Sequence, residues 1–192
     1  MKHRSDISHL ILSETYENVW AKVNNWDEYA RRATNRLLTV AIHIPFVYEV
    51  NGNHFLDWEK YIGRFPCICF TNSLEIDGWR VEHGYRLDPY FQLQQPWYSL
   101  AGYFHRWYFK TPFQEKLREN ENYPRHVEWI RTNYKQWASE EGNPKKVIIF
   151  HTHSQDWSSN ALTGVEVVNL ASLAEDGVFA ILEDGKLEIR QL

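Results

Sequence analysis

Two histidines separated by a single residue are the clearest chemical signal in this sequence. They are His151 and His153, and they follow an apolar, β-branched run at residues 147–150. Because successive side chains of a strand point to opposite faces, residues two apart share a face, and the two imidazoles should lie side by side. Zinc sites commonly combine histidine nitrogens with a carboxylate, and a catalytic zinc activates a bound water for hydrolysis. The pair therefore predicts a zinc-dependent hydrolase.

Such a site needs a third ligand and a general base, and carboxylates can supply both. Asp156 and Glu166 follow the histidine pair closely enough for either to be the third ligand. The base would come from further upstream, where Glu82 is a candidate beside Glu49 and Glu75. The sequence alone does not rank these three upstream carboxylates.

The same residues also have a purely structural interpretation. Thr163 and Glu166 have the Thr-x-x-Glu spacing of a capping box, whose side chains bond backbone N–H groups at the start of a helix. Asp156 suits an Asx-turn in a polar loop. Under this interpretation the histidine pair is incidental, with one ring bonded to a neighbour and the other solvated.

The elements that would position these residues can be predicted from apolar spacing. Three segments have the three- and four-residue spacing of amphipathic helices, namely residues 13–37, 124–140 and 163–176. Short β-branched runs predict strands at residues 38–44, 66–71 and 146–151, and residues 154–161 have the composition of a polar loop. Three further pairs of strands are expected to flank the hairpin signals Asn51-Gly52, Asp77-Gly78 and Asp184-Gly185.

This order of elements predicts an α+β fold, with a mixed, mostly antiparallel sheet and three main helices. We expect one domain over residues 1–192. The polar, charged stretch after Pro112 would be the place for a subdivision into residues 1–112 and 113–192.

Composition restricts the partners. The formal charge of −4 argues against broad, nonspecific nucleic-acid binding, which requires a cationic face. No apolar run approaches the length of a membrane span or a signal peptide, so we expect no membrane association. Cys67 and Cys69 are too close in sequence for an unstrained disulfide, and we expect them to be buried and reduced, as in a cytoplasmic protein.

Aromatic residues make up 16% of the chain and are dense in residues 85–109. Large rings can simply fill a core, or they can form a platform for a partner. The second interpretation predicts a non-enzymatic binding or assembly protein, with residues 85–109 as its working surface. Exposure of Trp97, Trp107 and Tyr108 would distinguish the two.

The stretch from His151 to Val167 resembles the JAMM, or MPN-type, metalloprotease motif, in which His-x-His is followed by a spacer and by Ser-x-x-Asp at a helix start. In this resemblance His151 and His153 match the zinc ligands, Thr163 matches the serine that stabilises the oxyanion, and Glu166 matches the aspartate. The likeness covers residues 124–192, with a longer spacer than the motif has. It implies zinc-dependent hydrolysis of a peptide or isopeptide bond in a protein or peptide substrate, with Glu82 the nearest match to the upstream base.

The same histidines also resemble the opening of a PHP phosphoesterase, which begins with His-Thr-His-Ser and continues through residues 159–181. That resemblance implies a metal cluster that hydrolyses phosphate esters. Only eleven residues follow Ile181, whereas the family's remaining ligands lie downstream of this motif. This position in the chain argues against the phosphoesterase resemblance. A phosphoesterase, or more broadly a nucleic-acid-processing protein, is the further alternative to the peptidase.

Overall fold

The structure is a computed structural model. It describes residues 8–13, 44–52, 68–88, 122–152, 154–170 and 177–191. The chain divides into two compact units. Unit 1 comprises residues 1–72 and 99–110, and unit 2 comprises residues 73–98 and 111–192.

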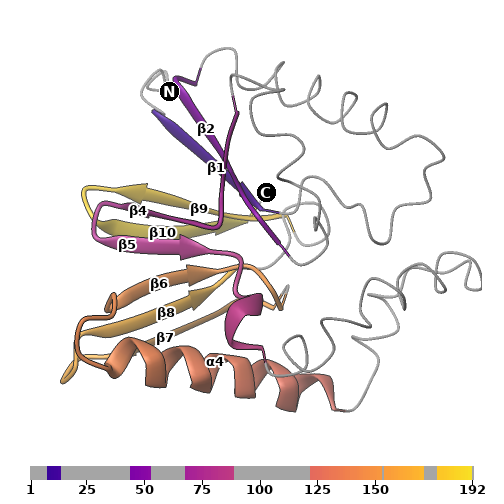
Figure 1. The fold of residues 1–192 in the computed structure, drawn as a ribbon, viewed down its shortest axis with the longest axis vertical. Helices are drawn as coiled ribbons and strands as arrows, with labels where there is room; N and C mark the ends of the chain where they lie inside the picture. The colour runs from indigo at the N-terminus through magenta and orange to yellow at the C-terminus, as the bar shows by residue number, and fades with distance from the viewer. Residues whose placement is uncertain are drawn as a thin grey trace, which may run out of the picture. The chain divides into compact units, whose positions relative to one another are not determined.

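In unit 1 the described residues form a small parallel sheet, two of whose three strands, β1 and β2, are labelled in Figure 1. Its central strand pairs with a parallel neighbour on each side. The central strand is buried at Val47, Glu49 and Val50, as parallel sheets usually are. The strands are β1 (His9–Ser13), β2 (Phe46–Val50) and β3 (Ile68–Thr71), in the order β1-β2-β3.

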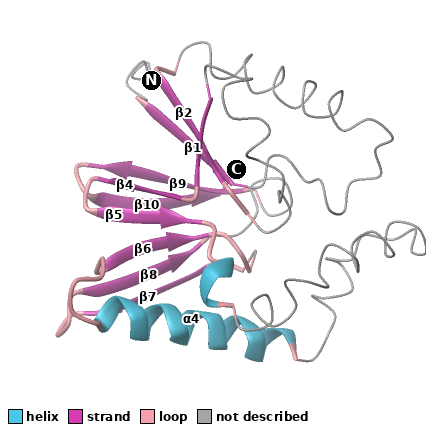
Figure 2. Cartoon of the chain, viewed as in Figure 1, coloured by secondary structure: helices cyan, strands magenta, loops and turns pink. Residues whose placement is uncertain are grey.

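Unit 2 contains a five-stranded mixed sheet (Figure 2). Its three inner strands run parallel, and each outer strand is antiparallel to its neighbour. The order is β4-β5-β6-β8-β7, with β4 (Ser73–Ile76), β5 (Trp79–Glu82), β6 (Lys146–Ile149), β7 (Asp156–Asn160) and β8 (Val165–Asn169). Because the inner strands are parallel, their carboxyl ends meet at one edge, which we call the carboxyl edge of this sheet.

One face of this sheet is covered by α4 (Tyr123–Ser139), which lies lengthwise beside the sheet in Figure 1. The helix buries Ile130, Tyr134 and Ala138, which recur at helical spacing. They pack against the side chains of β6 and β8 that face the helix, Val147, Ile149, Val165 and Val167. Full burial of each large aliphatic side chain is worth about 1.5–3 kcal/mol, so this contact fixes the helix on the sheet.

A hairpin of β9 (Val178–Glu183) and β10 (Lys186–Gln191) completes the described part of unit 2. Its turn and the β4–β5 turn both use Asp-Gly, with positive φ at all four residues, as tight hairpin turns require. The two turns are joined, because Nε1 of Trp79 donates a hydrogen bond of 3.1 Å to the carbonyl of Gly185.

The predicted fold class is wrong. The described residues contain one α-helix and ten strands in three sheets, and the largest sheet is mixed rather than mostly antiparallel. The predicted helix at 163–176 is strand β8 over its described part, and the predicted loop at 154–161 contains strand β7. The α4 helix and both Asp-Gly hairpins are confirmed. Strand β6 is confirmed too, but it ends at Ile149, so that His151 lies in the turn after the strand rather than on it.

The predicted hairpin around Asn51-Gly52 is only half supported. Strand β2 ends at Val50 as expected, but its neighbours are the parallel strands β1 and β3. The returning strand at 54–56 lies outside the described residues, as do nearly all of the predicted helix 13–37 and strand 38–44. Ser13, where that helix was expected to start, is the last residue of β1.

Candidate functional site

The carboxyl edge of the sheet in unit 2 gathers several titratable side chains. Strand β5 leads directly into His83, and β6 leads through Phe150 into His151. The amide groups of Phe150 and His151 both donate to the carbonyl of His83, each at 2.8 Å. The two segments are thereby locked together where the strands end. In open sheets with parallel strands, this edge is the usual location of a binding site.

Four side chains form the cluster, which we call the His–Asp cluster: His83, Asp88, His126 and His151. Nε2 of His151 donates a 2.8 Å hydrogen bond to Oδ2 of Asp88, and Nε2 of His126 lies 3.4 Å from the same oxygen. The ring of His83 meets that of His151 edge to face, with 5.0 Å between centroids. Asp88 is only 4% exposed and His83 only 1%. The cluster is therefore largely buried.

Gly84 allows the two histidine-bearing segments to approach. Its φ of 114° lies in the region that only glycine adopts readily. A Cβ at this position would lie 3.0 Å from Cβ of His151 and 3.1 Å from Cβ of Ile149. Both the backbone conformation and the space thus require glycine here. The short 3₁₀ helix η2 (Tyr85–Leu87) follows, and Asp88 directly after it contacts His126 and His151.

The charge of Asp88 is stabilised by the two imidazoles. Burial by itself would raise the pKa of this carboxyl, because it disfavours the ionised form. The side-chain contacts with His126 and His151 outweigh that effect and hold the pKa of Asp88 well below its ordinary value. Asp88 is therefore ionised at neutral pH and acts as an acceptor for both rings.

Polar side chains also fix the turn on either side of His153. Nδ2 of Asn169, at the end of β8, donates to Oγ1 of Thr152 and, at 2.5 Å, to the carbonyl of Ser154. The hydroxyl of Tyr123, the first residue of α4, donates to the carbonyl of Thr152. The residues before and after His153 are thus anchored, although His153 itself lies outside the described residues.

The predicted carboxylate ligands have other partners. Asp156, on β7, pairs with Arg131 of α4. Glu166 lies on β8 directly opposite Lys146, and Nζ of Lys146 is 3.0 Å from Oε1 of Glu166. Thr163 precedes that strand, and its Oγ1 accepts a 3.4 Å hydrogen bond from the amide of Val165 instead of capping a helix.

Across the part of the chain that the structure describes, no three His, Cys, Asp or Glu side chains are arranged to hold a metal ion. Asp156 and Glu166 therefore do not join His151 in such a group. Because the predicted set also includes His153, the zinc site as a whole stays a prediction.

Glu82, the predicted base, is buried beneath α4 in a network of its own. The hydroxyl of Tyr134 donates to it, Nε of Arg80 donates at 2.8 Å, and Nη2 of Arg86 lies 3.4 Å away. Both guanidinium groups also lie over the ring of Trp137. Burial, then the charge and hydrogen bond of Glu82, raise the pKa of Tyr134 well above its ordinary value. This network ties the helix to β5.

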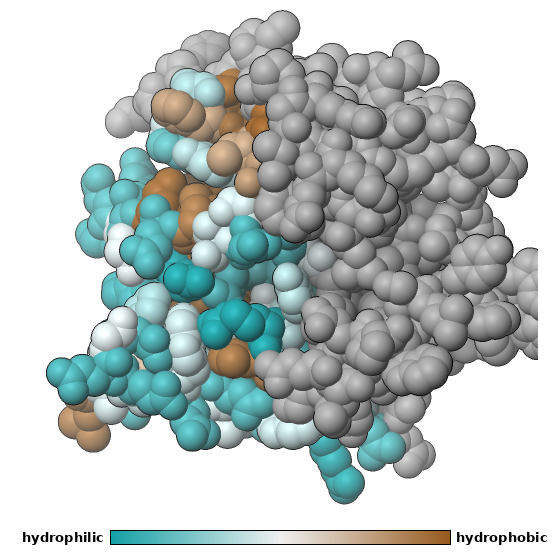
Figure 3. Space-filling view, viewed as in Figure 1, coloured by the Kyte–Doolittle hydropathy of each residue, from teal (hydrophilic) through white to brown (hydrophobic). Residues whose placement is uncertain are grey.

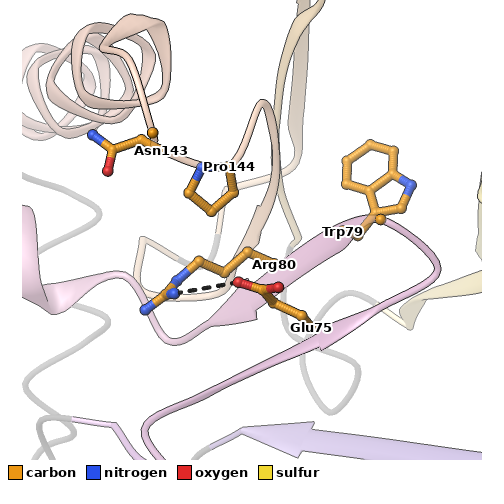
Figure 4. A pocket seen from close by; sticks show the side chains of 7 residues that line it. Glu75, Trp79, Arg80, Asn143 and Pro144 are labelled. Carbon is orange, nitrogen blue, oxygen red and sulfur yellow. Dashed lines mark ion pairs between the residues drawn. The ribbon is translucent and has the colours of Figure 1, made fainter.

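The other upstream carboxylates lie elsewhere. Glu49 is buried on β2 in unit 1, and Glu75 lies on β4, 3.8 Å from Arg80. Glu75 and Arg80 line a pocket of about 290 Å³ between the β4–β5 turn and the loop before β6 (Figure 4). This pocket lies where β5 and β6 begin, so it is separate from the His–Asp cluster where they end.

Sequence reasoning missed three members of the cluster. His83 stands at the end of a strand and before a glycine, and that position was a usable signal. Asp88 and His126 have no local signal, because they join the site only through the packing of η2 and α4 on the sheet.

Most of the predicted aromatic surface, residues 89–109, lies outside the described residues. Among the described residues, the large hydrophobic side chains that are exposed are Phe46, Trp129, Trp157 and Leu162. On the face drawn in Figure 3 the described residues are mostly hydrophilic, and hydrophobic side chains occupy separate small areas.

No protein-family model matches this sequence, and no curated protein matches it. No helix in the described part of the chain combines the length and the apolar character that a membrane span needs.

Proposed function

We propose that this chain is a metal-dependent hydrolase whose site lies at the carboxyl edge of the sheet in unit 2. The observation that carries the proposal is the buried hydrogen bond between Nε2 of His151 and Asp88. Histidines that bind metal typically donate their second ring nitrogen to a carboxylate, which fixes the ring and raises its basicity. With Nε2 protonated and bonded to Asp88, Nδ1 of His151 is the nitrogen that can bind a metal.

Two further imidazoles would complete the ligand set. His83 lies in ring contact with His151, and His153 follows two residues along a turn that Asn169 and Tyr123 anchor. Three histidines are an established ligand set for zinc. When bound, zinc would supply a water of lowered pKa as the nucleophile. The chain's own contribution is to orient the rings and, through burial, to limit access of solvent.

The substrate class depends on the charge around the site. The first turn of α4 lies at this edge and contains Arg125 and His126 but no acidic residue. A helix amino terminus carries partial positive charge and favours anions, which suits a phosphate ester. Hydrolysis of a peptide or isopeptide bond remains the second candidate, although the helix that the metalloprotease motif has after its spacer is strand β8 in this chain. For either substrate we expect a cytoplasmic enzyme, because its cysteines suit a reducing compartment.

Metal analysis and substrate hydrolysis test the proposal. We expect the purified full-length chain to bind zinc or another divalent metal, and to hydrolyse para-nitrophenyl phosphate faster than a library of fluorogenic peptides. His83→Ala and His151→Ala should abolish both binding and turnover. His9→Ala, in strand β1 of unit 1, is the matched control and should change neither. An intact protein that binds no divalent metal would exclude this function and favour the non-enzymatic binding protein.

A further inference from the structure

We infer that His126 is a positioning residue, which acts through Asp88 to determine which ring nitrogen of His151 carries the proton. The inference rests on one buried carboxylate oxygen that receives two imidazoles from different elements. Oδ2 of Asp88 lies 2.8 Å from Nε2 of His151, in the segment after β6, and 3.4 Å from Nε2 of His126, in the first turn of α4. Asp88 itself follows η2.

A neutral imidazole carries its proton on one nitrogen, and the hydrogen bond made by one nitrogen decides the role of the other. An ionised carboxylate can only accept, so the 2.8 Å contact of Asp88 with Nε2 favours the tautomer of His151 that is protonated at Nε2. The carboxylate does so more strictly when its own oxygen is held in place, and the imidazole of His126, with Nε2 3.4 Å from that oxygen, restrains it. A carboxylate with 4% exposure has little access to water that could replace this donor.

The helix that carries His126 is itself fixed at several points. Nδ2 of Asn133 donates a 3.1 Å hydrogen bond to the carbonyl of Leu87, the residue before Asp88. Tyr134 bonds Glu82 on β5, and Tyr123 bonds the carbonyl of Thr152, directly after His151. The helix therefore provides a rigid reference from which His126 can hold Asp88.

The consequence for metal binding rests on the proposed function, but the positioning itself can be measured without metal. In the metal-free, full-length protein, ring ¹⁵N chemical shifts report the tautomer of His151. We expect one form, protonated at Nε2, in the wild type. His126→Leu, which lacks a donor, should convert it to a mixture of both tautomers. His126→Gln keeps an N–H donor of similar reach and should restore the single form.

Far-ultraviolet circular dichroism identifies variants that fold, and His126→Phe, which also lacks a donor, replaces His126→Leu if the latter does not. A folded variant without the donor that keeps a single Nε2-protonated His151 would overturn the inference. The zinc affinity of His126→Leu should fall about 10-fold or more, as is typical when a residue that orients a metal ligand without binding the metal is replaced. If the tautomer changes but the wild type binds no metal, the proposed function fails and the positioning role stands.

Discussion

His151 and Asp88 are separated by 63 residues in sequence, yet Nε2 of one lies 2.8 Å from Oδ2 of the other. The contact joins the end of β6 to the segment after β5, across the carboxyl edge of the sheet. It also determines how the imidazole is oriented. Several measurable consequences follow from this contact and from the residues that support it.

Replacing Asp88 by Asn should destabilise the metal-free protein. The change removes a buried charge that accepts hydrogen bonds from two imidazoles, and hydrogen bonds to charged groups contribute roughly 1.5–3 kcal/mol. We expect the free energy of unfolding in urea to fall by about that amount. Asp77→Asn makes the same chemical change in an exposed turn and should alter stability by less than about 0.5 kcal/mol. Equal effects of the two variants would contradict the role of Asp88.

Gly84→Ala should be more destabilising than Gly142→Ala. Both glycines have positive φ, so both variants incur backbone strain of roughly 1–3 kcal/mol. Only Gly84 has neighbours in the way, since its new Cβ would meet His151 and Ile149, whereas Gly142 has open space. Overpacking adds about 1–3 kcal/mol, so the difference between the variants in thermal or urea unfolding isolates the crowding at the site. Identical losses would show that the segments do not approach as described.

The alkaline stability of the protein should depend on Tyr134. Its pKa is raised in the folded state by burial and by the charge and hydrogen bond of Glu82. The positive charges of Arg86 and Arg80 lower this pKa, but by less. The folded state therefore keeps this proton at a pH at which the unfolded chain releases it. The stabilisation is complete below the ordinary tyrosine pKa of about 10 and is lost as the pH rises above that value.

Urea unfolding at pH 8 and at pH 11 measures this dependence. Tyr134→Phe should be less stable than the wild type at pH 8, because the hydrogen bond to Glu82 is lost. It should nevertheless lose less stability between the two pH values. Tyr48→Phe, in unit 1, is the control and should lose as much stability as the wild type does. A Tyr134→Phe variant with an undiminished alkaline loss would refute this assignment.

The proposed metal ligands can be tested against the carboxylate ligands that were predicted from the sequence. Asp156→Asn and Glu166→Gln should leave zinc binding within about twofold of wild type, because these carboxylates pair with Arg131 and Lys146. His83→Gln should weaken binding by at least about 100-fold if that ring is a direct ligand. Calorimetric titration with zinc measures all three. Loss of binding in Glu166→Gln would restore the original assignment.

The parts of the fold that could be predicted from sequence are those with local signals. The two Asp-Gly turns, α4 and β6 each have such a signal within their own residues. Residues 163–176 were misassigned because the apolar residues Val167, Leu170, Ala171 and Ala174 have the spacing of a helix, and Thr163 with Glu166 has that of a capping box. The strand is stabilised by residues outside this segment. Strand β8 pairs with β6, and Glu166 forms a cross-strand ion pair with Lys146.

In the candidate site, too, only the residues with a local sequence signal could be predicted. His151 could be identified from the end of its strand, and His83 had a weaker signal of the same kind. Asp88 and His126 could not be identified, because no spacing within the chain relates them to His151. Their approach is a result of how η2 and α4 pack on the sheet.

The carbonyl of His83, which accepts the amides of both Phe150 and His151, also affects how the protein opens. Those two amides can exchange with solvent deuterium only when the ends of β5 and β6 separate. Since β6 is also paired with β8 and covered by α4, that separation disrupts the core of unit 2. Phe150 and His151 should therefore be among the slowest amides to exchange, and exposure of this edge should be a subglobal unfolding event rather than a local loop motion.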